Sequence, residues 1–328
     1  MLLARLGRLG QAFLALLVLV VVLGFLMRLL GILPGDGTSP RAAVPAAPAV
    51  VAVKPPPVHE KRRSVAVARV EKKARPAKPA WQRYAAVMPS ARGRARVVIV
   101  IDDLGLDRSA VRRLAAIPGP LTLAFLPYAP EVAAQAAMMR AAGHELLVHL
   151  PMEPKGGGSD PGPMVLAERL SRAEFDRRLE WNLSRFEGYV GVNNHMGSRL
   201  TEDPRAMRRV MRALRARGLL FLDSRTTAGT VAEREAVALG LPHAARDVFL
   251  DNEQDAGAVR TQLARLERLA KRHGQAVAIG HPHRETLDAI GKWIPAAKRH
   301  GLVLVPLSAV VEMPQPSRLS ATAAAGRN

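Results

Sequence analysis

Aspartate and histidine residues follow a series of short apolar runs in this chain of 328 residues. Asp102 and Asp103 come after "VVIVI", His149 comes after "ELLV", and His281 comes after "VAIG". Runs of this length that are rich in Val, Ile and Leu are typical of buried β-strands. Carboxylate and imidazole groups bind zinc and similar divalent ions, and they also transfer protons. The pattern therefore predicts metal or acid–base chemistry at strand ends.

The segment "HLPME" places a second candidate ligand four residues after His149. We expect Pro151 to turn the chain, which would bring Glu153 back beside the histidine. Together with an aspartate, these two side chains would form a site for zinc or a similar divalent ion. Each residue type also has a structural explanation, because an aspartate can cap the following helix and a single strand-end histidine can serve packing.

The segment "NNHMGSRLTED" is rich in hydrogen-bonding side chains and is expected to be an irregular loop. Asn193, Asn194 and Ser198 surround His195 there. These amides and this hydroxyl either orient a sugar or another ligand, or satisfy the backbone of the loop itself. Later apolar runs also end in polar residues, namely Asp223, Ser224 and Arg225, then Asp251 and Asn252, and finally His281 and His283.

Beyond Arg96 the chain alternates between short β-rich runs and longer amphipathic segments such as "DPRAMRRVMRALRARG". Several amphipathic segments end in glycine, as helices often do. These glycines are Gly143, Gly218, Gly274 and Gly301. Alternating strands and helices predict a parallel sheet covered by helices. Seven or eight such units in about 230 residues favour an α/β fold of the (β/α) barrel type, in which functional groups gather at the C-terminal ends of the strands.

The N-terminal segment predicts a membrane anchor. Arg5 and Arg8 precede an uncharged apolar stretch from Leu9 to Met27, which is nearly long enough to span a bilayer core of roughly 30 Å. A cleavable signal peptide is the alternative, although its apolar region is usually shorter and no small-x-small site directly follows Met27. The positive-inside rule then places the rest of the chain outside the cytoplasm. In a Gram-negative bacterium, the domain would lie in the periplasm, attached to the inner membrane by a single span.

The following segment, from Pro34 to about residue 95, is rich in Pro, Ala, Val, Lys and Arg and lacks periodicity, which predicts a disordered tether. Residues 1–96 contain 17 Lys and Arg and 3 Asp and Glu, a net charge of +14, which leaves only +6 of the total of +20 for the rest. The tether is either a soluble spacer or a segment attracted to anionic lipids and acidic polymers. Nucleic acid is not an expected partner, because the remaining basic residues lie mostly on helical faces.

Cysteine is absent, which excludes disulfides, thiolate catalysis and Cys-based zinc sites. His, Asp and Glu are therefore the available metal ligands. The predicted organisation is an anchor in residues 1–33, a tether in 34–95, a barrel domain in 96–315 and a short disordered tail in 316–328.

Residues 96–312 resemble the divergent polysaccharide deacetylases, distant relatives of the NodB-type carbohydrate esterases. The Asp-Asp pair of "VIDDLG" matches the first motif of those esterases, and "GHELLVH" matches the start of the second at His149. Glu153 stands where the second histidine of that motif is expected, and "VAIGHPH" matches a late histidine at His281. The Arg-x-Pro-aromatic element is missing, and "NNHMGSRLT" stands in its position. The resemblance implies a distorted (β/α) barrel of about seven strands, NodB-like and similar to a TIM barrel.

The resemblance also implies an activity, hydrolysis of an acetamide or acetyl ester with a metal-activated water. Asp103, His149 and His195 would hold the ion, and Glu153 would complete the shell or orient one of these ligands. Asp102 would be the general base and His281 the acid. Substrate would contact residues at the same C-terminal ends of the strands, namely Asn193, Asn194, Ser198, Asp223, Ser224, Arg225 and His283.

The implied function is deacetylation of N- or O-acetyl groups in an envelope polysaccharide such as peptidoglycan, with zinc as the expected cofactor. A different class of function stays open. The replaced histidine and the missing arginine are also compatible with a noncatalytic envelope scaffold that binds glycan or protein through a degenerate deacetylase fold.

Overall fold

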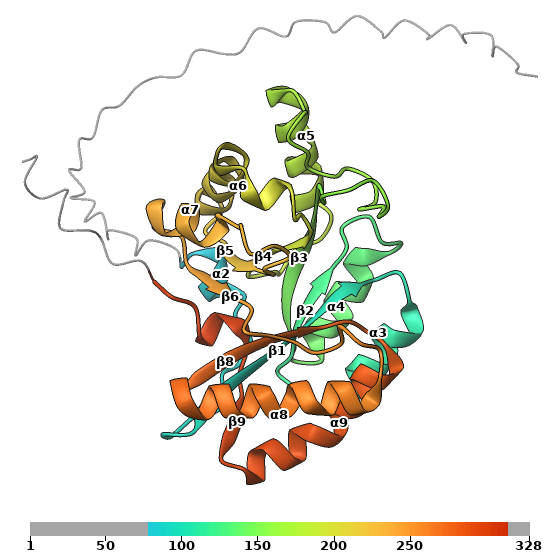
Figure 1. Ribbon diagram of the computed structural model, residues 1–328, viewed down its shortest axis with the longest axis vertical. Coiled ribbons are helices and arrows are strands. Elements are labelled where there is room, and N and C mark those ends of the chain that lie inside the picture. Colours follow the sequence, from blue (N-terminus) through green and yellow to red (C-terminus); the bar gives the residue numbers. More distant parts are fainter. Residues whose placement is uncertain (1–77, 314–328) are drawn as a thin grey trace, which may run out of the picture. The chain divides into compact units, whose positions relative to one another are not determined.

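The computed structural model describes residues 78–313, which form a parallel sheet of nine strands with helices in the connections (Figure 1). Eight strands follow the order β6-β5-β4-β3-β2-β1-β8-β7, and β9 pairs with β1. The strands are β1 (Ala95–Leu104), β2 (Thr122–Phe125), β3 (Glu145–Met152), β4 (Gly191–Met196), β5 (Leu220–Asp223), β6 (His243–Ala245), β7 (Val248–Phe249), β8 (Gln275–Gly280) and β9 (Leu302–Leu304).

The helices that connect or flank these strands differ widely in length. They are α2 (Ala80–Arg83), α3 (Arg108–Ala115), α4 (Val132–Ala141), α5 (Arg172–Leu183), α6 (Pro204–Ala216), α7 (Ala232–Ala238), α8 (Ala256–His273) and α9 (Arg284–Arg299), with short 3₁₀ turns at Leu200–Glu202 and Leu307–Ala309. The two longest, α8 and α9, lie side by side against β8 and β9 (Figure 1).

The predicted distorted (β/α) barrel is confirmed, with nine strands instead of about seven. All strand pairs are parallel, and the terminal strands β6 and β7 of the path do not pair with each other among the described residues. The sheet is therefore a curved, open barrel. The sequence prediction missed β6, because "HAA" is short and lacks the β-branched residues that mark the other strands.

Alternate residues of the strands belong to two apolar layers. In β1, Val97 and Ile99 pack in the larger cluster, which includes the buried residues of the surrounding helices. Val98 and Val100 belong to a second cluster with Leu147 of β3 and residues of other strands, on the inner side of the curved sheet. This period of two decides which strand-end side chains point toward the barrel axis.

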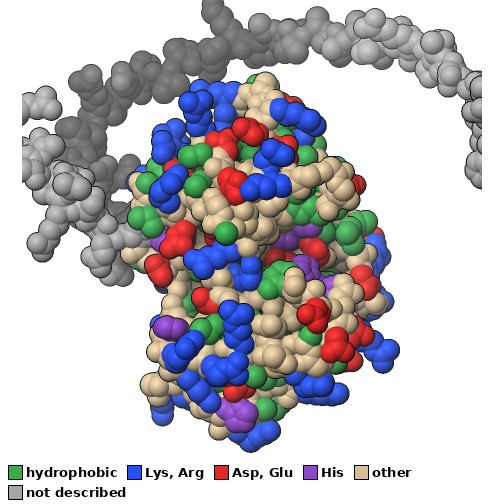
Figure 2. All heavy atoms as spheres, viewed as in Figure 1, with side chains coloured by type: hydrophobic (Ala, Val, Ile, Leu, Met, Phe, Trp, Pro, Cys, Tyr) green, Lys and Arg blue, Asp and Glu red, His purple; other side chains and the backbone are tan. Residues whose placement is uncertain are grey.

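Helix α6 shows how the predicted helices form. Asp203 caps its N-terminus by accepting a hydrogen bond from the amide of Arg205, and Pro204 occupies the first helical position. Its apolar residues are buried, while its arginines form ion pairs such as Arg208–Glu235. Over the face shown in Figure 2, basic and acidic side chains are interspersed. The four glycines predicted to end helices all have positive φ, between 64° and 91°.

The packed part of the chain begins before the predicted domain start at residue 96. Ala80 of α2 is buried in the core, and the amide of Trp81 donates to the carbonyl of Gly218. Within residues 78–313 no helix is long and apolar enough to cross a membrane. The predicted anchor, the predicted tether up to residue 77 and the predicted tail lie outside the described residues.

Glu145, at the start of β3, joins the N-terminal and C-terminal segments of the domain. Its carboxylate is fully buried and accepts hydrogen bonds from the amides of Ala86 and Ser308 and from the Ser308 hydroxyl. Glu145→Ala would leave these donors buried without an acceptor, and we expect it to lower the free energy of unfolding by about 2–4 kcal/mol.

Chemical denaturation of the wild type and the Glu145→Ala variant would measure this loss. Glu253→Ala, which removes an exposed glutamate, is the control and should change stability by less than about 0.5 kcal/mol. Equal stability of the two variants would show that Glu145 does not join the segments.

Candidate metal centre

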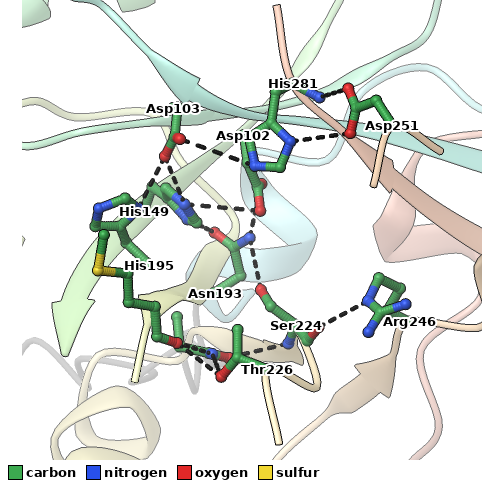
Figure 3. Close-up of polar contacts among 12 residues, drawn as sticks. Asp102, Asp103, His149, Asn193, His195, Ser224, Thr226, Arg246, Asp251 and His281 are labelled. Atoms are coloured by element: carbon green, nitrogen blue, oxygen red, sulfur yellow. Dashed lines mark hydrogen bonds and ion pairs between the residues drawn. The ribbon is translucent and has the colours of Figure 1, made fainter. Parts of the chain in front are cut away.

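Three potential ligands converge at the C-terminal ends of β1, β3 and β4 (Figure 3). Asp103 Oδ1 lies 3.1 Å from His149 Nε2 and 2.8 Å from His195 Nδ1. One ligand atom from each of the three residues lies within 4.8 Å of the other two. Two imidazole nitrogens and one carboxylate oxygen are a donor set that zinc and similar divalent ions use.

The strand register explains why the two histidines meet. In the β3–β4 pairing, His149 lies opposite Asn193, and Pro151 lies opposite His195. His149 follows Leu147 by two residues on the inner side of β3, and His281, directly after β8, follows Ile279 by two residues. Buried apolar residues that come two residues earlier in the chain therefore support the polar groups at the strand ends.

A bulge in β1 brings both carboxylates of the Asp pair to one place. The register with β2 shifts between Ile101 and Leu104, and Asp103 has a positive φ of 56°. In a regular strand, adjacent side chains point to opposite faces. Here Asp102 Oδ2 and Asp103 Oδ1 lie 3.7 and 3.1 Å from the same atom, His149 Nε2. The sequence alone predicts the pair but not this bulge.

The surroundings of Asp103 fit a bound cation. Among the described residues, its Oδ1 atom is buried and has no hydrogen bond of acceptable geometry, although two imidazole nitrogens lie beside it. Burial raises the pKa of Asp103, but the neighbouring His149 and His195 outweigh burial and hold that pKa well below its usual range. A charged, buried carboxylate oxygen without a hydrogen bond is costly unless a cation compensates it. Asp103, His149 and His195 thus fit a divalent ion.

His281 lies on the other side of Asp103, with Nε2 3.8 Å from Asp103 Oδ2. Its Nδ1 lies 3.0 Å from Asp251 Oδ1, and Asp251 Oδ2 accepts hydrogen bonds from the His281 amide and the Thr286 hydroxyl. Burial alone would lower the pKa of His281, yet the bond to Asp251 and the nearby Asp102 raise it to about 9. His281 is therefore held in its protonated form at neutral pH.

Asp251, His281 and His283 form a second group of potential ligands within 4.8 Å of one another. The three hydrogen bonds to Asp251 already occupy both of its oxygens, and His283 Nε2 lies 3.1 Å from the side-chain nitrogen of Gln254. This group is better explained as a histidine–aspartate pair than as a metal site.

The sequence match agrees with this geometry. Residues 99–311 match the sequence model of the divergent polysaccharide deacetylases. The chain belongs to this family. The predicted family membership is thus confirmed, and the matched residues include the Asp pair and all three histidines of the site.

Individual relatives match a similar share of the chain. YibQ of Escherichia coli (strain K12) is 36% identical over 202 residues, which are 61% of this chain and 62% of YibQ. A protein of Haemophilus influenzae is 33% identical over 196 residues, 60% of this chain and 69% of that protein. The crystal structure of ATU2773 from Agrobacterium tumefaciens C58 is 33% identical, covers 70% of this chain and 94% of its own, and has a TM-score of 0.68. The match thus spans less than two thirds of YibQ.

The family pattern places a metal ligand near Glu153, but the structure does not bring this residue to the ion site. The predicted turn at Pro151 does not form, because β3 continues through Met152. Four residues of extended chain span about 13 Å, which separates Glu153 from His149. The Glu153 carboxylate instead accepts a hydrogen bond from the Glu168 amide and lies 3.7 Å from the Arg199 guanidinium. The structure therefore does not support Glu153 as a ligand of this site.

Four of the predicted substrate-binding residues are buried and use their polar atoms within the protein. Asn194 Oδ1 accepts from the Ser224 amide, and the Asp223 carboxylate accepts from the Arg225 amide and the Thr230 hydroxyl. These contacts order the loops after β4 and β5, so this part of the prediction needs correction. The four residues are Asn193, Asn194, Asp223 and Ser224.

The other three predicted substrate residues keep some exposed surface. Ser198 accepts a hydrogen bond from the Lys155 amide, and Arg225 forms an ion pair with Glu233. His283 lies beside His281, with ring centroids 5.9 Å apart. Contact of these three residues with substrate stays a prediction.

Asp251 is the functional residue that the sequence left without a role. It follows an apolar run, as the other site aspartates do, but only the fold places it beside His281. Arg246 carries no comparable signal in the sequence. It donates hydrogen bonds to the carbonyls of Ser224 and Arg225 (Figure 3). It thereby holds the loop after β5, in which Ser224 contacts Asn193.

Proposed function

We propose that this protein is a metal-dependent hydrolase that removes N- or O-acetyl groups from an envelope polysaccharide of the peptidoglycan type. The observation that carries the proposal is the arrangement around Asp103. His149 and His195 lie beside its buried Oδ1 atom. Asp102 lies 3.7 Å from His149 Nε2, and His281 lies 3.8 Å from the other oxygen of Asp103. A metal site with a separate base and acid is what acyl hydrolysis requires.

Zinc is the proposed cofactor, because two imidazoles and one carboxylate are a typical ligand set of catalytic zinc. Asp103, His149 and His195 would hold it. When bound, such an ion lowers the pKa of water to roughly 7 and polarises the acyl oxygen.

Asp102 is the proposed general base. It is almost completely buried, and burial raises its pKa above the usual value, so that it is a stronger base than an exposed aspartate. Asn193 Nδ2 donates to Asp102 Oδ1, which leaves Oδ2 free to face the reacting water beside the ion site.

His281 is the proposed acid. Its proton is held at a pKa of about 9, and it would pass to the leaving nitrogen or oxygen of the sugar as the acyl bond breaks.

We further propose that the domain works outside the cytoplasm, at the inner membrane of a Gram-negative envelope. The apolar stretch from Leu9 to Met27 supports this location, since it would serve as an uncleaved anchor. The Pro-rich segment after it would let the domain reach glycan away from the membrane surface.

The test is release of acetate from acetylated chito-oligosaccharides and from peptidoglycan by the purified protein. Activity that is lost on chelation and restored by zinc supports the proposal. A protein that binds these glycans without releasing acetate, with metal or without it, would instead be a noncatalytic envelope scaffold.

The raised pKa of His281 gives a prediction that does not depend on turnover. In metal-free wild-type protein, the ring should titrate near pH 9, and in Asp251→Asn the midpoint should fall toward the ordinary value of 6.5. Because the folded pKa lies above the unfolded one, this histidine stabilises the fold below about pH 6.5 and loses that contribution as the pH rises through about 9.

NMR of the His281 ring protons against pH would measure both midpoints. A wild-type midpoint at or below 6.5 would contradict the role of Asp251 and remove the support for His281 as the acid.

A further inference from the structure

Asn193 lies between the proposed base and one of the proposed metal ligands. Its Nδ2 atom donates to Asp102 Oδ1 at 2.8 Å and to Ser224 Oγ at 3.2 Å. Its Oδ1 atom lies 2.9 Å from His149 Nδ1. One buried amide on β4 thus contacts a side chain of β1, a side chain of β3 and the side chain directly after β5 (Figure 3).

The Asp102 carboxylate fixes the orientation of the amide. A carboxylate oxygen can only accept a hydrogen bond, so the NH₂ group must face Asp102 and the carbonyl oxygen must face His149. His149 Nδ1 then carries a hydrogen and donates it to Asn193 Oδ1. In the neutral imidazole this leaves the lone pair on Nε2, the atom that faces Asp103 Oδ1.

We propose that Asn193 is a positioning residue, which fixes the metal-binding tautomer of His149 and the orientation of Asp102 through a single amide. This inference rests on the proposed metal-dependent function. The ring nitrogen of a ligand histidine that does not bind the ion is commonly held by an acceptor of this kind. Here the same side chain also holds the base, so the metal site and the base are coupled.

Contact with substrate does not explain this residue, because Asn193 has no exposed surface. Packing does not explain it either. An apolar side chain of similar volume would fill the space but would leave the His149 N–H and one Asp102 oxygen without a partner, which is costly in a buried site.

Two substitutions separate the two contacts. In Asn193→Asp, a carboxylate can still accept from His149 Nδ1 but cannot donate to Asp102. We expect zinc affinity within about tenfold of wild type and a kcat at least about 100-fold lower. In Asn193→Ala both contacts are lost, and we expect zinc affinity to fall by roughly 10 to 100-fold as well.

The control is Asn182→Ala. Asn182 is equally buried, and its amide donates to the carbonyls of Met164 and Arg178, outside the metal centre. This variant should lose stability but keep the wild-type zinc affinity. Zinc affinity would be measured by competition with a chelating dye, on full-length proteins whose folding is checked by circular dichroism.

The outcomes separate this inference from the proposed function. Wild-type protein that binds no zinc would overturn both. Wild-type protein that binds zinc no more tightly than Asn193→Ala, or an Asn193→Asp variant with the wild-type kcat, would overturn the positioning role alone. A zinc affinity close to that of wild type in Asn193→Asp, together with a reduced zinc affinity in Asn193→Ala, would support the positioning role. If Asn193→Ala does not fold, the Asn193→Asp result decides the question.

Discussion

His149→Ala is expected to abolish stoichiometric zinc binding, with affinity reduced by more than about 100-fold. The three proposed ligands are Asp103 and the two imidazoles beside its Oδ1 atom. The substitution removes one of them and leaves too few for a stable metal site. The effect should exceed the 10 to 100-fold loss that follows removal of a residue outside the coordination shell. Elemental analysis of the purified variant after dialysis against zinc would measure it.

Glu153→Gln is the matched control for this experiment. Although Glu153 follows His149 by only four residues, its carboxylate lies in contact with Glu168 and Arg199. This variant should therefore keep one zinc per chain. Loss of zinc in both variants, or in neither, would contradict the assignment of ligands.

Asp102→Asn should retain zinc but lose hydrolysis by about 10²–10⁴-fold, because it removes only the proton acceptor. The asparagine oxygen can still accept the hydrogen bond from Asn193, so the geometry of the site should be preserved. Acetate release at saturating substrate, together with zinc content, would show the two effects separately.

Asp288→Asn, a change on the exposed part of α9, serves as the control and should leave both values unchanged. A rate for Asp102→Asn within a few-fold of wild type would exclude Asp102 as the base.

Much of the fold could be predicted because the sequence pattern is locally consistent. The alternation of residues such as Val98 and Val100 with Val97 and Ile99 defines the two faces of β1, and the same period places Asp102 on the inner face. Glycines predicted helix ends in the same way, as Gly218 does just after α6. These features depend on neighbours in the chain, so the sequence carries them directly.

The metal centre could be predicted only in part, because it depends on local deviations from regular structure. The bulge at Asp103 bends the end of β1 so that both aspartates face His149, and no residue type in "VIDDLG" requires it. Conversely, a turn was expected at Pro151, but the strand pairing with β4 extends β3 past this residue. Pairing with β4 outweighs the tendency of proline to form a turn. Because β3 stays extended, Glu153 lies away from the ion site.

Burial was the other property that the sequence did not reveal. Asn193 and Asn194 are adjacent amides that were both expected to meet substrate. Both are instead buried on β4. Asn193 contacts His149 of the site, and Asn194 accepts a hydrogen bond from Ser224 in the loop after β5. Asp251 illustrates the reverse case, because its importance depends on a contact with His281, 30 residues later.

The most direct test of the central claim is anomalous diffraction at the zinc edge from crystals of the zinc-loaded domain. We expect one strong peak within bonding distance, about 2.0–2.2 Å, of Asp103, His149 and His195. A peak at Asp251, His281 and His283, or no peak at these strand ends, would contradict it.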